Sequence, residues 1–333
     1  MKHLLDTPWW ICDEEDTNYC SYVDTDSNYF HAEPILRYKF PNFDEMSDKE
    51  KDSKLEGIAI KYQKIITDHY NILAKEAFNI NQFEWFDKPH WLEMKTECVI
   101  RSAYFRSNRR YAQWITKQEG IEKETLDIKG LEFKKANFPP KLGEFFHGVL
   151  VDVLKGANQN EIDIRLQEFK TKIYDGTIPL SDLGSPTAIK QLNKHQGPSA
   201  KAGEMFSRLN IVYSKKKKEE NDKKTHKIGA PAAVRAAIRY NDLLKFWKLN
   251  NKHSYISQGD KIKWIWLKSN PYQLEALAFL EFDMPEKIRI FLEEYADRGK
   301  TFESILLNKL EGFYGDLGWV LNLNPYKQKL FNL

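Results

Sequence analysis

The chain contains the stretch Asn18-Tyr-Cys-Ser-Tyr-Val-Asp-Thr-Asp-Ser-Asn-Tyr-Phe30, which decides how its fold and chemistry are interpreted. Two carboxylates, Asp24 and Asp26, lie between two runs rich in aromatic and β-branched residues, and this pattern predicts a β-hairpin with an acidic turn. Cross-strand hydrogen bonds fix the backbone of such a turn, so both carboxylates can share one small patch. Mg²⁺ prefers oxygen ligands and usually takes one or two carboxylates. The stretch therefore predicts a magnesium site at the turn.

Two other interpretations of the acidic turn stay open on the local pattern. Asp, Thr and Ser favour turns because their side chains bond to the nearby backbone, so the carboxylates could be purely structural. The alternating spacing of Asp24, Asp26 and Asn28 also fits a calcium loop. Such a loop requires Gly where Tyr29 stands and Glu where Ile35 stands, which disfavours calcium.

Composition bounds the size of the core and points to a polarised charge distribution. The chain has 333 residues, 41% of them hydrophobic, which is enough for one large or two moderate cores. Residues 1–60 carry 14 acids and 6 bases, whereas residues 190–252 carry 16 bases and 5 acids. An acidic patch and a basic stretch fit a metal site combined with a grip on a phosphate backbone. A solvated linker beside an acidic face fits the same distribution, so both interpretations stay open.

Cysteine usage and hydropathy bear on the compartment. Cys12, Cys20 and Cys98 are odd in number and lack metal-ligand spacing, which predicts a reducing compartment without a disulfide framework. No secretory signal is recognisable at Met1, and no run reaches the roughly 18 apolar residues that a membrane span needs. We therefore expect a soluble, cytoplasmic protein that does not bind a membrane.

The order of the predicted elements indicates an α+β fold. Strands flank the acidic turn, residues 34–54 are expected to form a loop, and a helical stripe covers residues 55–78. Alternation over residues 91–116 predicts antiparallel strands packed under that helix. A mainly helical part follows from Pro139. Its expected helices cover residues 141–154, 160–174, 230–249, 274–279, 286–298 and 302–312, with a strand at 259–268.

Residues 22–27, Tyr-Val-Asp-Thr-Asp-Ser, resemble motif C of the family B DNA polymerases, Tyr-x-Asp-Thr-Asp-Ser. Later segments resemble, in the same order, further parts of T-even-type phage replicative polymerases. Met94-Lys-Thr-Glu97 resembles the strand that places a third carboxylate near the metals. Asn108-Arg-Arg-Tyr-Ala112 resembles the Lys-Lys-Arg-Tyr segment that grips the primer–template minor groove, with Arg109 in place of the usual Lys. Lys129-Gly-Leu-Glu132 resembles the Lys-Gly-x-Glu passage from palm to thumb.

The helical part carries a looser likeness to the same enzymes. Gly229-Ala-Pro-Ala-Ala-Val-Arg-Ala-Ala-Ile-Arg-Tyr240 resembles their thumb helix, and Gly259-Asp-Lys-Ile-Lys-Trp resembles the hairpin that follows it. The resemblance implies three parts. These are the C-terminal part of a palm over residues 1–135, a thumb over residues 136–320, and a tail over residues 321–333.

Two polymerase motifs are not found in this sequence. Motif A, an Asp before Ser-Leu-Tyr-Pro, does not occur, and neither does motif B, a fingers helix with Lys and Asn-Ser-x-Tyr-Gly. The 21 residues before Tyr22 leave no room for a proofreading exonuclease. The resemblance therefore implies one half of a split polymerase, with the other half on a partner chain. A non-catalytic DNA-binding accessory protein that keeps a palm-like scaffold is the alternative, although a scaffold has no use for two adjacent carboxylates.

The resemblance also implies roles for individual residues. Asp26 would be the principal metal ligand with Asp24 beside it and Glu97 as a peripheral acid, around two Mg²⁺ ions shared with the partner chain. Three residues of the turn region would lie next to the incoming deoxynucleoside triphosphate (dNTP), namely Tyr22, Thr25 and Ser27. The residues implied to bind primer–template DNA are Arg109, Arg110, Tyr111, Lys129, Lys134 and Lys135.

The last six residues, Gln328-Lys-Leu-Phe-Asn-Leu333, resemble a sliding-clamp-binding peptide. They follow a polar stretch that contains Pro325, so an apolar pair at the terminus is poorly placed for a core. The resemblance implies that Leu330 and Phe331 insert into a clamp pocket while Gln328 hydrogen-bonds beside it. A tail folded back onto the thumb is the open alternative.

Overall fold

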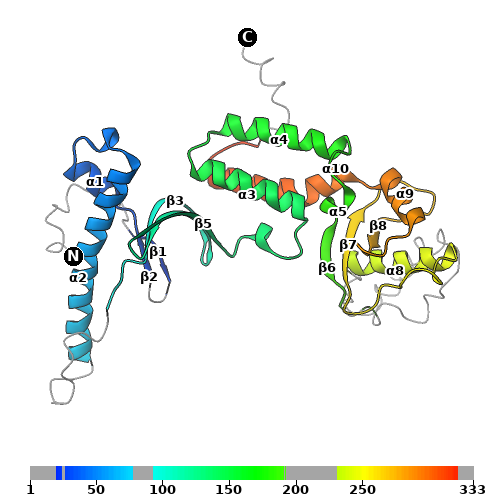
Figure 1. The fold of residues 1–333 in the computed structure, drawn as a ribbon, viewed down its shortest axis with the longest axis horizontal. Coiled ribbons are helices and arrows are strands. Elements are labelled where there is room, and N and C mark those ends of the chain that lie inside the picture. The colour runs from blue at the N-terminus through cyan, green and yellow to red at the C-terminus, as the bar shows by residue number, and fades with distance from the viewer. Residues whose placement is uncertain (1–19, 25–26, 78–92, 191, 193–230, 322–333) are drawn as a thin grey trace, which may run out of the picture. The chain divides into compact units, whose positions relative to one another are not determined.

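The computed structural model describes residues 20–24, 27–77, 93–190, 192 and 231–321 (Figure 1). The chain divides into two compact units, residues 1–131 and 132–333, close to the expected palm–thumb boundary. The sheets of both units are antiparallel, and helices lie beside them, so the fold is α+β as the sequence predicts. Among the described residues, no helix has both the length and the apolar character to cross a membrane.

The first unit opens with the predicted hairpin. Strand β1 (Cys20–Asp24) pairs antiparallel with β2 (Ser27–Phe30), and Asp24 lies opposite Ser27. The register shifts between Cys20 and Tyr22, which places a bulge at the open end of the hairpin. The hairpin prediction is confirmed for the described backbone. Thr25 and Asp26, between the paired residues, lie outside the described part of the chain.

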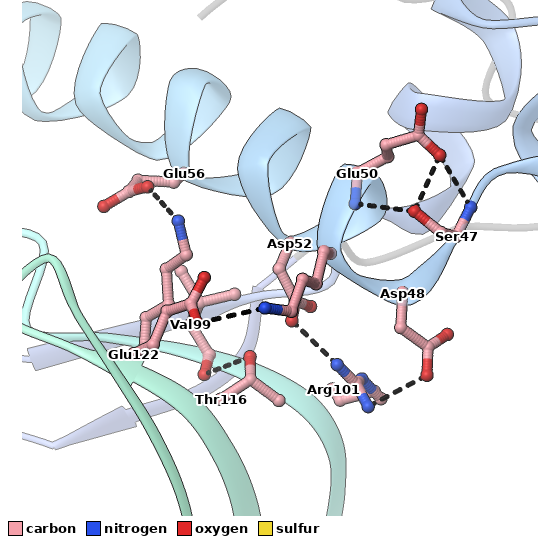
Figure 2. A network of polar contacts seen from close by, with 11 residues as sticks. Ser47, Asp48, Glu50, Asp52, Glu56, Val99, Arg101, Thr116 and Glu122 are labelled. Atoms are coloured by element: carbon pink, nitrogen blue, oxygen red, sulfur yellow. Dashed lines mark hydrogen bonds and ion pairs between the residues drawn. The ribbon is translucent and has the colours of Figure 1, made fainter.

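The expected loop over residues 34–54 is wrong. It contains α1 (Glu33–Lys39), the short helix η2 (Phe43–Glu45) and the start of α2 (Asp48–Ala77). Pro34 lies in the first turn of α1, where its missing N–H costs nothing. Ser47 and Glu50 bond to each other's backbone N–H at the start of α2, the reciprocal cap that stabilises helix N-termini (Figure 2).

The second sheet of the first unit has three strands in the order β3 (Cys98–Ser107), β4 (Arg110–Gln118) and β5 (Ile121–Lys129). Antiparallel strands under α2 confirm the pattern predicted for residues 91–116, except that β3 begins at Cys98 instead of Trp91. β5 was not predicted, since its first four residues are exposed and three of them are charged.

Polar contacts join α2 to this sheet (Figure 2). The Arg101 guanidinium on β3 pairs with Asp48 at 3.0 Å and with Asp52 at 2.8 Å, and the Asp52 side chain is only 8% exposed. Lys117 on β4 pairs with Glu56 at 2.7 Å. One face of a long helix is therefore held by charge pairs instead of by apolar packing.

Backbone-to-side-chain hydrogen bonds continue this polar joint toward the C-terminus of α2. The Thr67 hydroxyl accepts from the Met94 N–H at 3.0 Å, and the Gln63 amide oxygen accepts from the Thr96 N–H at 2.9 Å. The apolar residues predicted to form the core stripe of the helix are covered only in part, since Ile72 is 55% and Leu73 45% exposed. The helix prediction holds, but its apolar stripe does not form the main contact with the sheet.

The second unit contains a helical layer with a continuous apolar core. Its elements are η4 (Glu132–Lys134), α3 (Pro140–Leu154), α4 (Gln159–Tyr174), α5 (Leu180–Leu183), α10 (Arg298–Thr301), the π-helical η5 (Phe302–Leu307) and α11 (Asn308–Asp316). Phe146 stacks on Phe133 with ring centroids 4.6 Å apart, and Phe145 stacks on Phe169 at 4.1 Å. The predicted helices at residues 141–154 and 160–174 are confirmed as α3 and α4.

The rest of the second unit is a three-stranded sheet covered by helices. The strands are β6 (Ser185–Ala188), β7 (Lys261–Trp266) and β8 (Ala276–Phe279), and the helices are α8 (Ala232–Phe246) and α9 (Glu286–Tyr295). α8 packs on β7 and β8. The helix expected over residues 274–279 is wrong, because the four buried apolar residues Ala276–Phe279 form the edge strand β8, and periodicity cannot distinguish such a short run from a helix.

Candidate functional site

The acidic hairpin is attached to the β3–β4–β5 sheet by four aromatic rings. Tyr22 comes from β1, Tyr29 from β2, Phe105 from β3 and Tyr111 from β4. Each ring contacts the other three, with centroid separations between 5.4 and 5.8 Å. Tilted and edge-on aromatic pairs at such distances each add about 0.5–1.5 kcal/mol beyond their buried area. This four-ring cluster therefore packs the two strands that flank the acidic turn, β1 and β2, against β3 and β4.

The three hydroxyl groups of the cluster make one contact with the β3–β4 turn and one contact with each other. The Tyr22 hydroxyl accepts a hydrogen bond from the backbone N–H of Arg109 at 2.9 Å, and the Tyr29 and Tyr111 hydroxyls lie 3.3 Å apart. Burial raises the pKa of Tyr29 well above its usual value, and the contact with Tyr111 raises it further. The raised pKa favours the protonated form of the Tyr29 hydroxyl.

A glycine completes this arrangement on the other side of the β3–β4 turn. A Cβ added at Gly130 would lie 2.1 Å from the carbonyl oxygen of Arg109 and 3.2 Å from Cγ of Arg110. The backbone of Gly130 has a φ of +62°, which also favours glycine. The turn between β3 and β4 is thus enclosed by the Tyr22 hydroxyl and by the Gly130 backbone.

The structure brings together most of the DNA-binding residues that the sequence predicts within the first unit. Tyr111 lies opposite Lys129 in the β4–β5 register, and Arg110 opposite Ser107 in the β3–β4 register. Arg109 and Lys129 are exposed, while Arg110 and Tyr111 are half-buried. The Lys129 ammonium lies 3.7 Å from Asp127, whose carboxylate accepts from the Gln113 amide at 3.0 Å. Positive charge and a phenol therefore share one end of the sheet with the hairpin.

Other predicted site residues lie elsewhere or outside the described chain. Glu97 is exposed and precedes β3, so the ten-residue strand separates it from the Arg109 turn. Ser27 is half-buried at the start of β2. The predicted residues outside the described part are Thr25, Asp26, Gln328, Leu330 and Phe331, and only the backbone of Asp24 is described.

The remaining predicted lysines belong to the second unit. Lys134 and Lys135 are exposed, in and after η4. Burial and then the charge of Lys134 lower the pKa of His147 on α3. The charge of Lys134 is therefore felt at His147 on α3.

Tyr29 and Phe105 were not singled out by any motif, although they complete the four-ring cluster. Their only sequence signal is the alternation of aromatic residues along predicted strands, which does not tell which rings meet. Among the residues described, no group of three or more His, Cys, Asp or Glu side chains could hold a metal ion. The magnesium prediction therefore depends on the acidic turn alone.

No protein-family model matches the chain, and no curated protein sequence matches it either. A functional assignment consequently rests on the residues and their arrangement.

Proposed function

We propose that this chain is one subunit of a family B DNA polymerase, which supplies motif C and the thumb. A partner chain would supply motif A, the fingers and the exonuclease. One observation carries the proposal. Three segments that resemble successive polymerase motifs are in contact, namely the hairpin of Tyr22, the turn of Arg109 and the Lys129–Gly130 segment.

This contact adds support that the linear motifs do not contain. The hydrogen bond from Arg109 to Tyr22 joins residues 87 positions apart, and no local pattern requires those two residues to meet. A chance match of short motifs predicts scattered positions. Segments that hold a metal site and a primer–template grip must instead lie side by side, because both act on the same DNA terminus.

The donor set of the acidic turn fits magnesium. Asp24 and Asp26 offer hard oxygen ligands on a hairpin whose frame is fixed by the four-ring cluster, and Mg²⁺ prefers such ligands. Asp26 would be the principal ligand with Asp24 beside it, while Glu97 would remain a peripheral acid. When bound, two Mg²⁺ ions shared with a partner's carboxylate would stabilise negative charge on the attacking and leaving oxygens of phosphoryl transfer.

The basic end of the β3–β4–β5 sheet would hold primer–template DNA. Arg109 and Lys129 are exposed there and would neutralise phosphates, which position a duplex without reading its sequence. Tyr111 would reach the minor groove. Lys134 and Lys135 would extend the grip into the thumb, and Tyr22, Thr25 and Ser27 would border the dNTP.

The tail would add a contact with a sliding clamp. Leu330 and Phe331 would fill a clamp pocket beside Gln328, and such a tether raises the effective concentration at the primer end. Deleting residues 328–333 should shorten the products made with a clamp and leave single-turnover incorporation unchanged. Equal product lengths would exclude the clamp role.

The decisive experiment is primer extension with the purified chain, alone and mixed with a chain that carries motifs A and B. We expect no incorporation by this chain alone and extension by the mixture. Asp26→Asn should abolish extension while primer–template affinity stays nearly intact, whereas Asp68→Asn, an exposed carboxylate on α2, should change neither.

Three outcomes would contradict this proposal. Extension by the chain alone would exclude the split enzyme. A rate for Asp26→Asn above about a tenth of the unsubstituted rate, which is a loss below about 1.4 kcal/mol, would exclude Asp26 as the principal ligand. DNA binding without extension in any mixture would favour the accessory scaffold.

A further inference from the structure

The second unit carries an aromatic cluster at the C-terminal end of α8. It joins Phe246 and Trp247 to Tyr272 in the loop before β8 and to Phe291 and Tyr295 on α9, with neighbouring ring centroids 4.9 to 6.1 Å apart. Phe291 is buried, Trp247, Tyr272 and Tyr295 are half-buried, and Phe246 is 50% exposed. This α8–α9 cluster therefore presents one accessible ring on a base of packed rings.

One buried side chain holds the loop that carries Tyr272. The Asn270 amide donates to the carbonyl oxygens of Lys268 at 2.8 Å and Leu274 at 2.7 Å. Its oxygen accepts from the N–H groups of Tyr272 at 3.2 Å and Leu274 at 3.0 Å. The Tyr272 hydroxyl in turn accepts from the indole N–H of Trp247 at 3.2 Å. The rings are preorganised, so a ligand that stacks on them would order little of the protein.

Lysines lie beside and between these aromatic residues. Residues 245–252, Lys-Phe-Trp-Lys-Leu-Asn-Asn-Lys, contain three lysines and no carboxylate. The Lys287 ammonium on α9 lies 4.7 Å from the ring centroid of Trp247. The backbone N–H of Lys268 donates to the carbonyl oxygen of Tyr295 at 2.8 Å, which places a further lysine next to the cluster. The rings therefore have basic surroundings.

The carboxylates of α9 have partners on their own helix. Glu286 and Glu293 both pair with Arg289, and the Glu294 side chain bonds to the Tyr295 hydroxyl. These acids therefore offset the lysines only in part. A partner that matches the surface is negatively charged and has flat, apolar faces. Single nucleic-acid strands have both properties, and proteins bind them without sequence preference by combining basic residues with rings on which bases stack.

We propose that the α8–α9 cluster binds a single nucleic-acid strand, with bases stacked on Phe246 and Tyr272 and phosphates held by Lys248, Lys268 and Lys287. A duplex fits less well, because its bases stack on one another and their faces are closed to protein rings. The inference goes beyond the proposed function, which concerns duplex contacts of other residues. It also gives a role to the described end of the basic stretch over residues 190–252.

The experiment measures the affinity of the full chain for labelled oligo-dT of about 16 nucleotides, a length that one such site can cover, by fluorescence anisotropy. Phe246→Ala should weaken binding about ten-fold through the lost stacking, and Phe246→Tyr, which keeps the ring, should restore it. Phe282→Ala is the matched control. Its ring is 99% exposed but stands between Glu281 and Asp283, so its removal should change nothing. Oligo-rU of the same length tells whether RNA serves as well as DNA.

A lysine pair tests the phosphate contacts. Lys287→Gln should weaken binding about three-fold and flatten its salt dependence, since one released counterion fewer contributes. Lys54→Gln, whose ammonium lies 4.9 Å from the ring centroid of Phe40 in the first unit, should alter neither. Equal effects of the two substitutions would show that overall charge, and not this surface, attracts the strand.

A strand of abasic residues separates stacking from a merely structural role of Phe246. It keeps the phosphates and lacks the bases, so the unsubstituted chain should bind it about ten-fold more weakly than oligo-dT. Phe246→Ala should weaken binding to the abasic strand no further. Equal losses for Phe246→Ala on both strands would overturn the inference, and so would equal losses for Phe246→Ala and Phe282→Ala on oligo-dT.

The inference and the proposed function can fail separately. An unchanged affinity of Phe246→Ala for oligo-dT would overturn the strand site even if the mixture of chains extends primers and Asp26→Asn abolishes extension. An active Asp26→Asn enzyme would instead overturn the proposed metal site and would leave the binding of single strands to be judged by its own result.

Discussion

Different kinds of interaction stabilise the two units of this chain internally. The second unit buries a continuous set of large apolar side chains, among them Phe279, Phe302, Phe313 and Leu166 at 1% exposure or less. In the first unit, α2 meets its sheet through Arg101, Lys117 and their carboxylate partners, and the hairpin meets the sheet through four half-buried rings. The candidate chemistry thus lies in the unit with the smaller apolar core.

This difference has a physical consequence for stability and for geometry. Apolar burial contributes about 25 cal/mol per Å² and depends little on orientation. Hydrogen bonds and ion pairs contribute less in net free energy but require defined positions of their atoms. The first unit should therefore be the less stable one, with its atoms more strictly placed.

The largest expected effect is that of Gly130→Ala in the first unit. A Cβ would meet the Arg109 carbonyl oxygen at 2.1 Å, and backbone atoms cannot swing aside. We expect a loss of about 4 kcal/mol or more in the unfolding free energy of this unit, measured by denaturant titration.

Gly120→Ala is the matched control for that substitution. Gly120 also has a positive φ, of +78°, but its added Cβ would make only an ordinary contact, at 3.7 Å from the Glu56 carboxylate. Its cost should be about 1–2 kcal/mol, the backbone term alone. Equal costs for both variants would show that the β3–β4 turn does not close on Gly130.

A core truncation in the second unit should have the next largest effect. Leu166→Ala removes a fully buried side chain of α4 and should cost about 3 kcal/mol. Because the two units have separate cores, only the transition of the second unit should move, as followed by hydrogen exchange. A parallel loss of protection in β3–β5 would show that the units unfold as one.

Breaking the polar joint should cost the first unit about 2 kcal/mol. Arg101→Met leaves the Asp52 carboxylate, 8% exposed, without its partner at 2.8 Å. The double variant Arg101→Met/Asp52→Leu should recover most of that loss, since it removes the stranded charge. Arg37→Met, whose carboxylate partners are largely exposed, should change the unfolding free energy little. No recovery in the double variant would mean that the pair is not the source of the loss.

The smallest expected effect is on how the unfolding free energy of the second unit depends on pH. The pKa of His147 is lowered in the folded chain by burial and by Lys134, so the unfolded chain binds a proton more readily. Stability should therefore fall as the pH drops through about 6.5 toward the lower folded-state value, and His147→Gln should remove this dependence. Lys134→Met should raise the pKa of His147 in an NMR titration, and an unchanged value would place Lys134 too far away to act.

Much of the fold could be predicted because local signals agree with it. Asn158 and Glu161 form a capping box that starts α4, and the acidic turn sits between strand-forming residues as expected. Ser47 and Glu50 are capping residues of the same kind at the start of α2. The loop expected over residues 34–54 was based instead on the polar character and the prolines of that stretch. The strand β8 could not be predicted, since four apolar residues in a row have no period.

The candidate site could be predicted only in its parts. Asp24, Arg109, Tyr111 and Lys129 follow from short motifs, but the contacts among their segments depend on long-range packing. The left-handed backbone of Gly130 and the ring of Phe105 acquire their roles only when β3, β4 and β5 are aligned. The spacing of residues along the chain does not reveal how these three strands are aligned.

The hydrogen bond that Tyr22 accepts comes from the main chain of Arg109 and not from its side chain. Every amino acid except proline carries that N–H, but Arg109 has a φ of +58°, which β-branched residues avoid, so position 109 can change among the residues that tolerate this backbone while the hydrogen bond is kept. An arginine stands here where the resembled pattern has a lysine. Under the proposed function, laboratory selection at position 109 would therefore change the contact with the duplex without altering the residues proposed to bind metal.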